Sequence, residues 1–310
     1  MAVVSIRHLT TYRYRKPVAF GEHRMMFRPL QAFDQRLLSA SVTVSPDPEL
    51  LRHIQDVSGA CVGVARFDAP ADRLVFDSRA RVEHTVHTSF EFETRDARVG
   101  VDSLYDAGDH TELAISLNRT HSDSGEVAQW ARRFVPAGGD VAVSTVLIEM
   151  THAIRAEFAY ALRLRGGPQS PAETLALRSG SCRDFAVLMM DAARSLGIAA
   201  RFVSGYIYSS SPKSGGKSGG RTGGGHTHAW MRAYVPGCGW MDFDPTNGIV
   251  GNLDLIRVAV VADPRLALPL WGSFDGEAED YVGMDVEVDL SVEDAAAAQP
   301  PFPLRVAQAG

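Results

Sequence analysis

Apolar and polar residues alternate along several segments of the first hundred residues, which is the period-two pattern of half-buried β-strands. The segments are residues 3–14, 37–46, 61–67 and 73–92, and a Ser-Gly turn precedes the third of them. The pattern predicts a small antiparallel β domain or sandwich. Its strands carry no constellation of catalytic side chains. Residues 94–113 are less regular and are predicted to form a connection.

The apolar spacing changes to three and four residues after this connection, which is the pattern of helices. Two helices are predicted within residues 124–134 and 140–160, and the Pro-Ala-Gly-Gly turn at Pro136 separates them. A very apolar helix over residues 182–196 follows, and a strand over residues 198–208 comes after it. Strands followed by a mixed helical region indicate the α+β class, with an N-terminal antiparallel β domain.

Cys182 lies where a turn of small residues becomes the apolar helix. Ser181 is a good N-cap and Asp184 stands three residues later, so the spacing is that of a capping box. Gly197 can take the left-handed conformation that ends the helix at Leu196. Cys182 is therefore predicted at the first helical position. At this end the free N–H groups and the helix dipole favour thiolate over thiol and could stabilise an oxyanion.

The charged residues of this helix collect in one narrow stripe at 100° per residue, and nearly all other positions are apolar. The stripe consists of Arg183, Asp184, Asp191 and Arg194. Cys182 points away from it, into the protein, so the helix is predicted to be largely buried. A structural buried cysteine is the alternative interpretation, because structural thiols outnumber reactive ones. Cys182 needs a base and an orienting group to become a candidate nucleophile.

Two alternating strands that flank the Pro-Gly-Cys-Gly turn at Pro236 supply these groups. Opposed residues of a hairpin point to the same side, so its polar faces must match. Pairing Tyr234 with Trp240 satisfies this condition and leaves residues 235–239 as the loop. Asp244 then becomes the diagonal neighbour of His228, within reach of the imidazole.

The same register places Asp242 opposite Arg232, where the two can form an ion pair. A cysteine at a helix start, a histidine on one strand and an acid on the next form a coherent catalytic set. His228 would deprotonate the Cys182 thiol and protonate the leaving amine, while Asp244 would orient the imidazole.

Length and composition limit the other possibilities. The chain has 310 residues, which favours two domains, and its predicted parts are residues 1–105, residues 106–290 and a tail over 291–310. The net charge is −6 without a basic cluster, so neither nucleic acid nor a membrane surface is an expected partner. The N-terminus lacks the apolar core of a signal peptide, and three widely spaced cysteines fit a reducing cytoplasm. The oligomeric state is left open.

The two motif regions resemble the transglutaminase-like superfamily, whose catalytic core is papain-like. GSCRDFAVLMMDAARSLGIAARFVSGYIY, from Gly180, is similar to its nucleophile segment, and THAWMRAYVPGCGWMDFDPTNG, from Thr227, is similar to its His and Asp segments. The resemblance implies that Cys182 is the nucleophile, His228 the base and Asp244 the orienting acid. IRHLTTYRYRKPV and DVSGACVGVARF resemble the β-rich domain of bacterial members, and IRVAVVADPRLALPLWGSF resembles their C-terminal continuation.

The resemblance implies cysteine-dependent acyl transfer on a peptide or protein substrate through a thioester, with hydrolysis as the first choice. A protein-crosslinking transglutaminase and a non-catalytic binding module that retains the cleft are the alternatives. The Gly/Ser-rich segment 209–225 is longer than the usual connection in this family, and it could gate or obstruct the cleft.

Three further residues are candidates for substrate binding. They are His226, which shares a face with His228, Trp230, which suits either a cleft wall or hairpin packing, and Tyr160, which suits either the site or packing. His226 and His228 form an H-x-H pair that could bind a metal with Cys182 or Asp244. The triad explains these residues without a metal, so no metal or cofactor is predicted.

Overall fold

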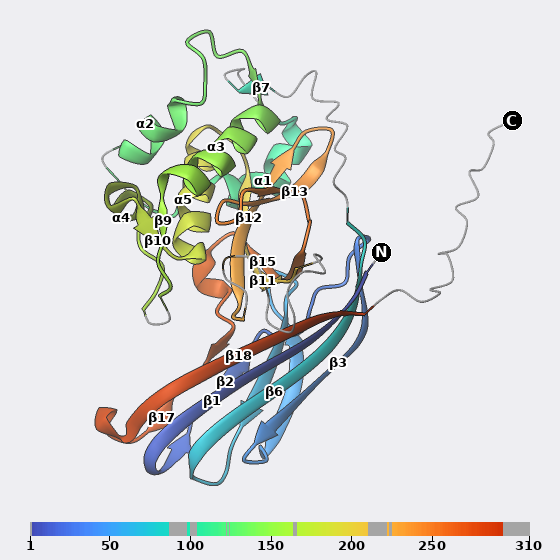
Figure 1. The fold of residues 1–310 in the computed structure, drawn as a ribbon, viewed down its shortest axis with the longest axis vertical. Helices are drawn as coiled ribbons and strands as arrows, with labels where there is room; N and C mark the ends of the chain where they lie inside the picture. Colours follow the sequence, from blue (N-terminus) through green and yellow to red (C-terminus); the bar gives the residue numbers. More distant parts are fainter. Residues whose placement is uncertain are drawn as a thin grey trace, which may run out of the picture.

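The architecture consists of a β part, in the lower half of Figure 1, and a mixed α/β core above it. This is a computed structural model, and it describes residues 2–86, 98–99, 104–121, 123, 125–163, 166–209, 222 and 225–293. The α+β class and the antiparallel β domain that the alternation predicts are confirmed. Within the described ranges, none of the helices combines the length and the apolar character needed to cross a membrane.

The β part contains two antiparallel sheets that share a hydrophobic core. One sheet joins β18 (Tyr281–Glu293), β1 (Ala2–Phe20), β6 (Ala71–His84) and β3 (Gln35–Ser45) in this order, and β17 (Phe274–Asp275) pairs with the end of β1. The other joins β16 (Leu270–Trp271), β2 (His23–Met25), β5 (Cys61–Arg66) and β4 (Leu50–Gln55). Phe20 and Phe76 of the first sheet pack in one cluster with Met25 and Ala65 of the second. The predicted sandwich is therefore present.

The last strand that the structure describes, β18, pairs with the first, β1. β18 pairs antiparallel with β1 from Val3 opposite Glu293 to Tyr14 opposite Tyr281. In Figure 1 the red strand β18 lies along the dark blue strand β1. The β part is thus built from both ends of the sequence. The domain boundaries at residues 105 and 290 stay predictions, although residues 291–293 of the predicted tail belong to β18.

The core contains a five-stranded antiparallel sheet. Its order is β14 (Ile249–Val250), β13 (Gly239–Asp244), β12 (His228–Val235), β11 (Ala200–Ile207) and β15 (Leu255–Val261). The helices are α1 (Ala107–Leu117), α2 (Glu126–Arg132), α3 (Val143–Glu157), α4 (Pro171–Leu177) and α5 (Cys182–Ser195). The short elements are β7 (Arg98–Val99), β8 (Val141–Ala142), β9 (Ala159–Tyr160), β10 (Ser179–Gly180), η1 (Pro264–Leu266) and η2 (Ala278–Asp280).

The predicted helices at residues 124–134 and 140–160 appear as α2 and α3. The prediction of an irregular connection over residues 94–113 is wrong for its last part, because α1 begins at Ala107. The Asp106 side chain accepts a hydrogen bond from the backbone N–H of Asp109 and caps this helix. Residues 87–92 of the fourth predicted strand lie outside the described residues.

Helix α5 is the central element of the core, and its predicted start at Cys182 is confirmed. The helix ends one residue earlier than predicted, and Gly197 takes the left-handed conformation with φ 77°. The charged side chains of its stripe are also mostly buried, and they form ion pairs and hydrogen bonds with other groups of the protein. Asp191 binds Arg119, and the Arg194 guanidinium donates to the carbonyl oxygens of Ala200 and Ala262.

Candidate active site

Cys182 occupies the first position of α5, and its side chain is almost fully covered, with 7% of the residue exposed. The capping box positions it: the Ser181 backbone N–H donates to Asp184 Oδ2 at 2.7 Å. The Asp184 carboxylate also binds Arg163 Nη1 at 3.0 Å, so Asp184 serves to hold this turn. Tyr160 lies alongside because β9 pairs in parallel with β10, with Tyr160 opposite Gly180.

The hairpin of β12 and β13 has the predicted register. Tyr234 lies opposite Trp240, and Arg232 lies opposite Asp242 with an ion pair of 3.3 Å between Arg232 Nε and Asp242 Oδ1. Pairing extends one step further than predicted, to Val235 opposite Gly239, so the loop is shorter by two residues. Matching polar faces therefore predicts the pairing of this hairpin.

His228 and Asp244 meet as this register requires. His228 Nε2 and Asp244 Oδ2 are 2.8 Å apart, and both side chains are completely buried. Asn247 Nδ2 donates to the same oxygen at 2.8 Å, and the Thr246 backbone N–H donates to Oδ1 at 2.9 Å. Sequence reasoning missed Asn247, although it stands three residues after Asp244 in the DPTN turn.

The charges of this pair stabilise one another. Burial alone would lower the pKa of His228, but the Asp244 carboxylate and the Cys182 sulfur outweigh it and raise the pKa. Burial would likewise raise the pKa of Asp244, but His228 and Asn247 lower it. An imidazolium paired with a carboxylate is therefore the favoured state at neutral pH. The other ring nitrogen, Nδ1, makes no hydrogen bond of standard geometry among the described residues and remains for Cys182.

A cleft of about 350 Å³ opens at Cys182 and His228. Two of the three predicted substrate-binding residues, His226 and Tyr160, line it. Burial, followed by the nearby Cys182 sulfur, raises the pKa of Tyr160 to about 12, so its hydroxyl stays protonated at neutral pH. Most of residues 209–225 lie outside the described residues, so the expectation that this segment gates the cleft stays a prediction.

Trp230 corrects the third substrate-binding prediction, because it is completely buried and does not line the cleft. Its ring stacks on His228 at 5.8 Å between centroids, and its Nε1–H donates to Asp242 Oδ1 at 2.8 Å. Gly205 leaves room for the indole: a Cβ there would lie 2.7 Å from Trp230 Cη2 and 2.1 Å from the Ile256 carbonyl oxygen. Trp230 thus packs against the imidazole ring of His228 and helps to hold it in place.

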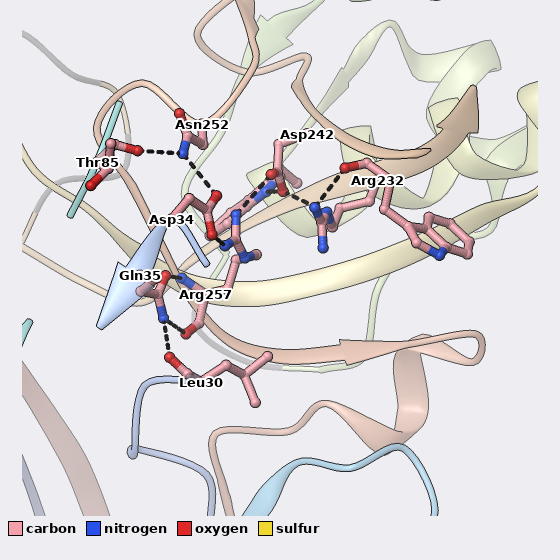
Figure 2. Close-up of polar contacts among 10 residues, drawn as sticks. Leu30, Asp34, Gln35, Thr85, Arg232, Asp242, Asn252 and Arg257 are labelled. Atoms are coloured by element: carbon pink, nitrogen blue, oxygen red, sulfur yellow. Dashed lines mark hydrogen bonds and ion pairs between the residues drawn. The ribbon is translucent and has the colours of Figure 1, made fainter. Parts of the chain in front are cut away.

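A buried network connects this support to the β part, and Figure 2 shows its members converging on Arg257. Arg257 forms ion pairs with Asp242, at 3.0 Å, and with Asp34 from the segment before β3. Burial would raise the pKa of Asp34, but Arg257 and Asn252 lower it, so the carboxylate stays charged. The predicted Arg232–Asp242 pair is therefore one edge of a larger network, and its charges need one another because water is excluded.

Replacing Arg257 by methionine is expected to lower the free energy of unfolding by about 3–5 kcal/mol, because Asp34 and Asp242 would lose their buried partner. Urea denaturation followed by circular dichroism measures the change. The control is Arg265→Met, whose side chain is 85% exposed beside Asp263, and which should change stability little. Equal effects of the two substitutions would contradict the importance of the buried network.

The β part also supplies one wall of the cleft, which sequence reasoning missed. His8, Thr10 and Tyr12 of β1 line it together with Met284 and Val286 of β18. His8 Nδ1 contacts the Tyr206 hydroxyl at 3.0 Å, and burial lowers the pKa of His8 to about 3, so the imidazole is neutral. The alternating pattern of β1 contained these residues, but only the fold brings them to Cys182.

The described residues contain no group of three or more His, Cys, Asp or Glu side chains arranged to hold a metal ion. Both histidines of the H-x-H pair line the cleft, and His228 binds Asp244.

Comparisons with known proteins agree with this architecture. Residues 4–83 match the family model of the bacterial transglutaminase-like N-terminal region, and residues 129–245 match that of the transglutaminase-like superfamily core. The second match contains Cys182, His228 and Asp244. An uncharacterized protein of Mycobacterium leprae is 28% identical over 91% of this chain and 96% of its own length. One of Mycobacterium tuberculosis is 26% identical over 92% of this chain and 91% of its own length.

A solved structure from Cytophaga hutchinsonii, described as a candidate cysteine protease, has a similar fold. The TM-score is 0.69 with 21% sequence identity, and the match covers 97% of this chain and 93% of that one. The similarity extends over both the β part and the core, so the combination of the two is a shared arrangement.

Proposed function

Because this chain belongs to the transglutaminase-like superfamily, we propose that Cys182, His228 and Asp244 form a catalytic triad that hydrolyses an amide or peptide bond through a thioester. The observation that carries the proposal is the buried contact between His228 and Asp244, at the floor of a cleft that also contains Cys182. A structural pair would not need to face a cysteine at a helix start.

The reaction follows from these positions. The Cys182 thiolate attacks the carbonyl carbon, and the carbonyl oxygen takes the negative charge. Backbone N–H groups of the first turn of α5 are the donors that would stabilise this charge. His228 then donates its proton to the leaving nitrogen, the C–N bond breaks and the amine departs. A thioester between Cys182 and the acyl group remains.

Water completes the cycle. His228 is now neutral and removes a proton from a water molecule that attacks the thioester carbonyl. The C–S bond breaks, the carboxylic acid leaves, and the thiolate and the imidazolium are restored. Asp244 keeps Nε2 occupied in every step, so Nδ1 is the nitrogen that exchanges protons with Cys182 and the substrate. Tyr160 and His226 would contact the substrate near the reacting carbon.

The cleft favours water over an amine as the second reactant. A crosslinking enzyme must hold a lysine-like ammonium beside the thioester, which calls for an acidic group near that ammonium. No Asp or Glu is among the described residues that line this cleft, whereas Arg183 lines it without a carboxylate partner among those residues. An ammonium group would be repelled there, so hydrolysis is the function that the charges support.

A side-by-side assay of release and amine incorporation tests this proposal. Wild-type and Cys182→Ala proteins are incubated with a pool of glutamine-containing peptides and a labelled primary amine. We expect ammonia or cleaved peptides from the wild type alone, with little labelled product. Efficient incorporation that depends on Cys182 would instead indicate a transglutaminase. Neither release nor incorporation, together with an unreactive Cys182, would support a non-catalytic binding module.

We also propose a cytoplasmic location. Cys61, Cys182 and Cys238 all lie within the described ranges and form no disulfide, which suits a reducing compartment.

A further inference from the structure

Arg183 directly follows Cys182 and lines the same cleft. Its side chain is half-buried, and Nη2 donates to the Arg163 carbonyl oxygen at 2.9 Å. This bond anchors the guanidinium of Arg183 in the cleft that Cys182 also lines. The charge of Arg183 also acts on Tyr160, another residue of the cleft, where it opposes the rise of the Tyr160 pKa. Arg183 is therefore both anchored and electrostatically active at the site.

The three arginines of the cleft differ in their partners. Arg163 binds Asp184 at 3.0 Å, and Arg265 binds Asp263 at 2.6 Å. Arg183 has no carboxylate partner in the part of the chain that the structure describes. A guanidinium whose partner among the described residues is one carbonyl oxygen retains donors for another acceptor in the cleft.

The surroundings increase the effect of this charge. The described cleft residues include no acid, and many are apolar. The large apolar ones include Phe27, Leu162, Phe202, Leu268, Met284 and Val286. A cleft of one charge sign with low-dielectric walls concentrates ligands of the opposite sign and raises association rates by about 10–10³. Arginine is suited to binding a carboxylate with two parallel hydrogen bonds.

We propose that the cleft takes an anionic acyl donor, in which Arg183 binds a carboxylate close to the scissile carbonyl while an apolar portion packs against the apolar side chains of the cleft. The proposal rests on the proposed function, because it names the substrate class of that site. The carboxylate can belong to an acidic side chain or to the free C-terminus of a short peptide. Both sources offer the same two oxygens to the guanidinium.

Alkylation of Cys182 tests the charge preference without a known substrate. Iodoacetate and iodoacetamide react with the same sulfur, but iodoacetate carries a negatively charged carboxylate where iodoacetamide carries a neutral amide. We compare their rates at Cys182 by mass spectrometry, at neutral pH and about 0.15 M salt, where remote charges are screened. Arg183→Gln should lower the iodoacetate-to-iodoacetamide ratio by at least about tenfold. The glutamine removes the charge but keeps a donor for the Arg163 carbonyl oxygen.

Arg265→Gln is the matched control, because Arg265 lines the same cleft but is paired with Asp263 and largely exposed. Its ratio should stay within about twofold of the wild type. A ratio that Arg183→Gln leaves unchanged would overturn the proposal. A fall of both rates by the same factor would also overturn it, because Arg183 would then act on the thiol and not on the anion.

Matched peptides then identify the source of the carboxylate. In one pair of peptides the residue beside the cleaved bond is either Glu or Gln. In the other pair the C-terminus is either free or amidated. The wild type should prefer the acidic member of one pair by at least about tenfold in kcat/KM, and Arg183→Gln should lose this preference. Turnover of all peptides without preference would refute the anionic donor while leaving hydrolysis intact. No turnover together with an unreactive Cys182 would refute both proposals.

Discussion

Cys182→Ala is expected to abolish turnover completely while leaving the fold intact. The reacting bond in the proposed mechanism forms to the Cys182 sulfur, and no other described cysteine lines the cleft. Alanine fits the first turn of α5, where the side chain is small and mostly covered. Peptide or ammonia release measures activity, and thermal unfolding verifies the fold.

Cys61→Ala and Cys238→Ala are the matched controls for this loss. Cys61 begins β5 and Cys238 lies in the turn before β13, neither residue lines the cleft, and both substitutions should retain nearly full activity. His228→Ala should reduce turnover almost as strongly as Cys182→Ala, because no other group contacts both the thiol and the leaving nitrogen. Residual activity in Cys182→Ala that matches the wild type would refute the thioester route.

Asp244→Asn is expected to lower the rate by roughly 10²–10⁴ with the fold retained, as for acids that set the tautomer of a catalytic histidine. Asp244 is the main group that raises the pKa of His228 against the effect of burial. Without this carboxylate, burial lowers the pKa of His228, and the buried ring becomes neutral at pH 7. Nitrogen NMR of labelled histidine should show an imidazolium in the wild type and a neutral ring in the variant.

The pH dependence of stability has a definite sign. The raised pKa of His228 contributes stability that is fully present below the ordinary value of 6.5 and is lost as the pH rises through the raised pKa. The lowered pKa of Asp244 contributes stability present above 3.8, which is lost as the pH falls through the lowered pKa. The wild type should therefore be more stable than Asp244→Asn, and the difference should be largest between pH 3.8 and pH 6.5.

The substitution Asp242→Asn distinguishes a catalytic role of an aspartate near His228 from a structural one. Asp242 binds Trp230, Arg232 and Arg257 but does not contact His228. This substitution should reduce stability and cost far less in rate per folded molecule than Asp244→Asn. If turnover proves sensitive to Asp242 and insensitive to Asp244, the assignment of the orienting acid is wrong.

The parts of the site that depend on local patterns were predictable from the sequence. The capping box of Ser181 and Asp184 set the start of α5 and thereby the position of Cys182. The matching polar faces of two adjacent strands set the hairpin register and brought Asp244 to His228. Both predictions needed only neighbours within about twenty residues, where alternation and capping chemistry determine the geometry.

The features that the sequence did not predict depend on distant contacts. β18 pairs with β1 across almost the whole chain, so nothing local indicates that Tyr12 and Met284 meet at the cleft. Trp230 shares a face with His228, but it is buried because it packs with Val203, Ile249 and Leu255 of the core, which come from three other strands. Alternation predicts which face a residue occupies and does not reveal what covers that face.

Chemical mapping of the three cysteines tests the central claim, that Cys182 is an activated nucleophile, most directly. Exposure alone would make Cys61 and Cys238 react first, because both are partly exposed whereas Cys182 is buried. Partial burial also raises the pKa of Cys61, but the Cys61 thiol is still more exposed than the Cys182 thiol. After brief treatment of the native protein with limiting iodoacetamide at neutral pH, we expect Cys182 to be alkylated ahead of both others, and this advantage to vanish in His228→Ala. Alkylation of Cys61 or Cys238 while Cys182 stays unmodified would contradict the account.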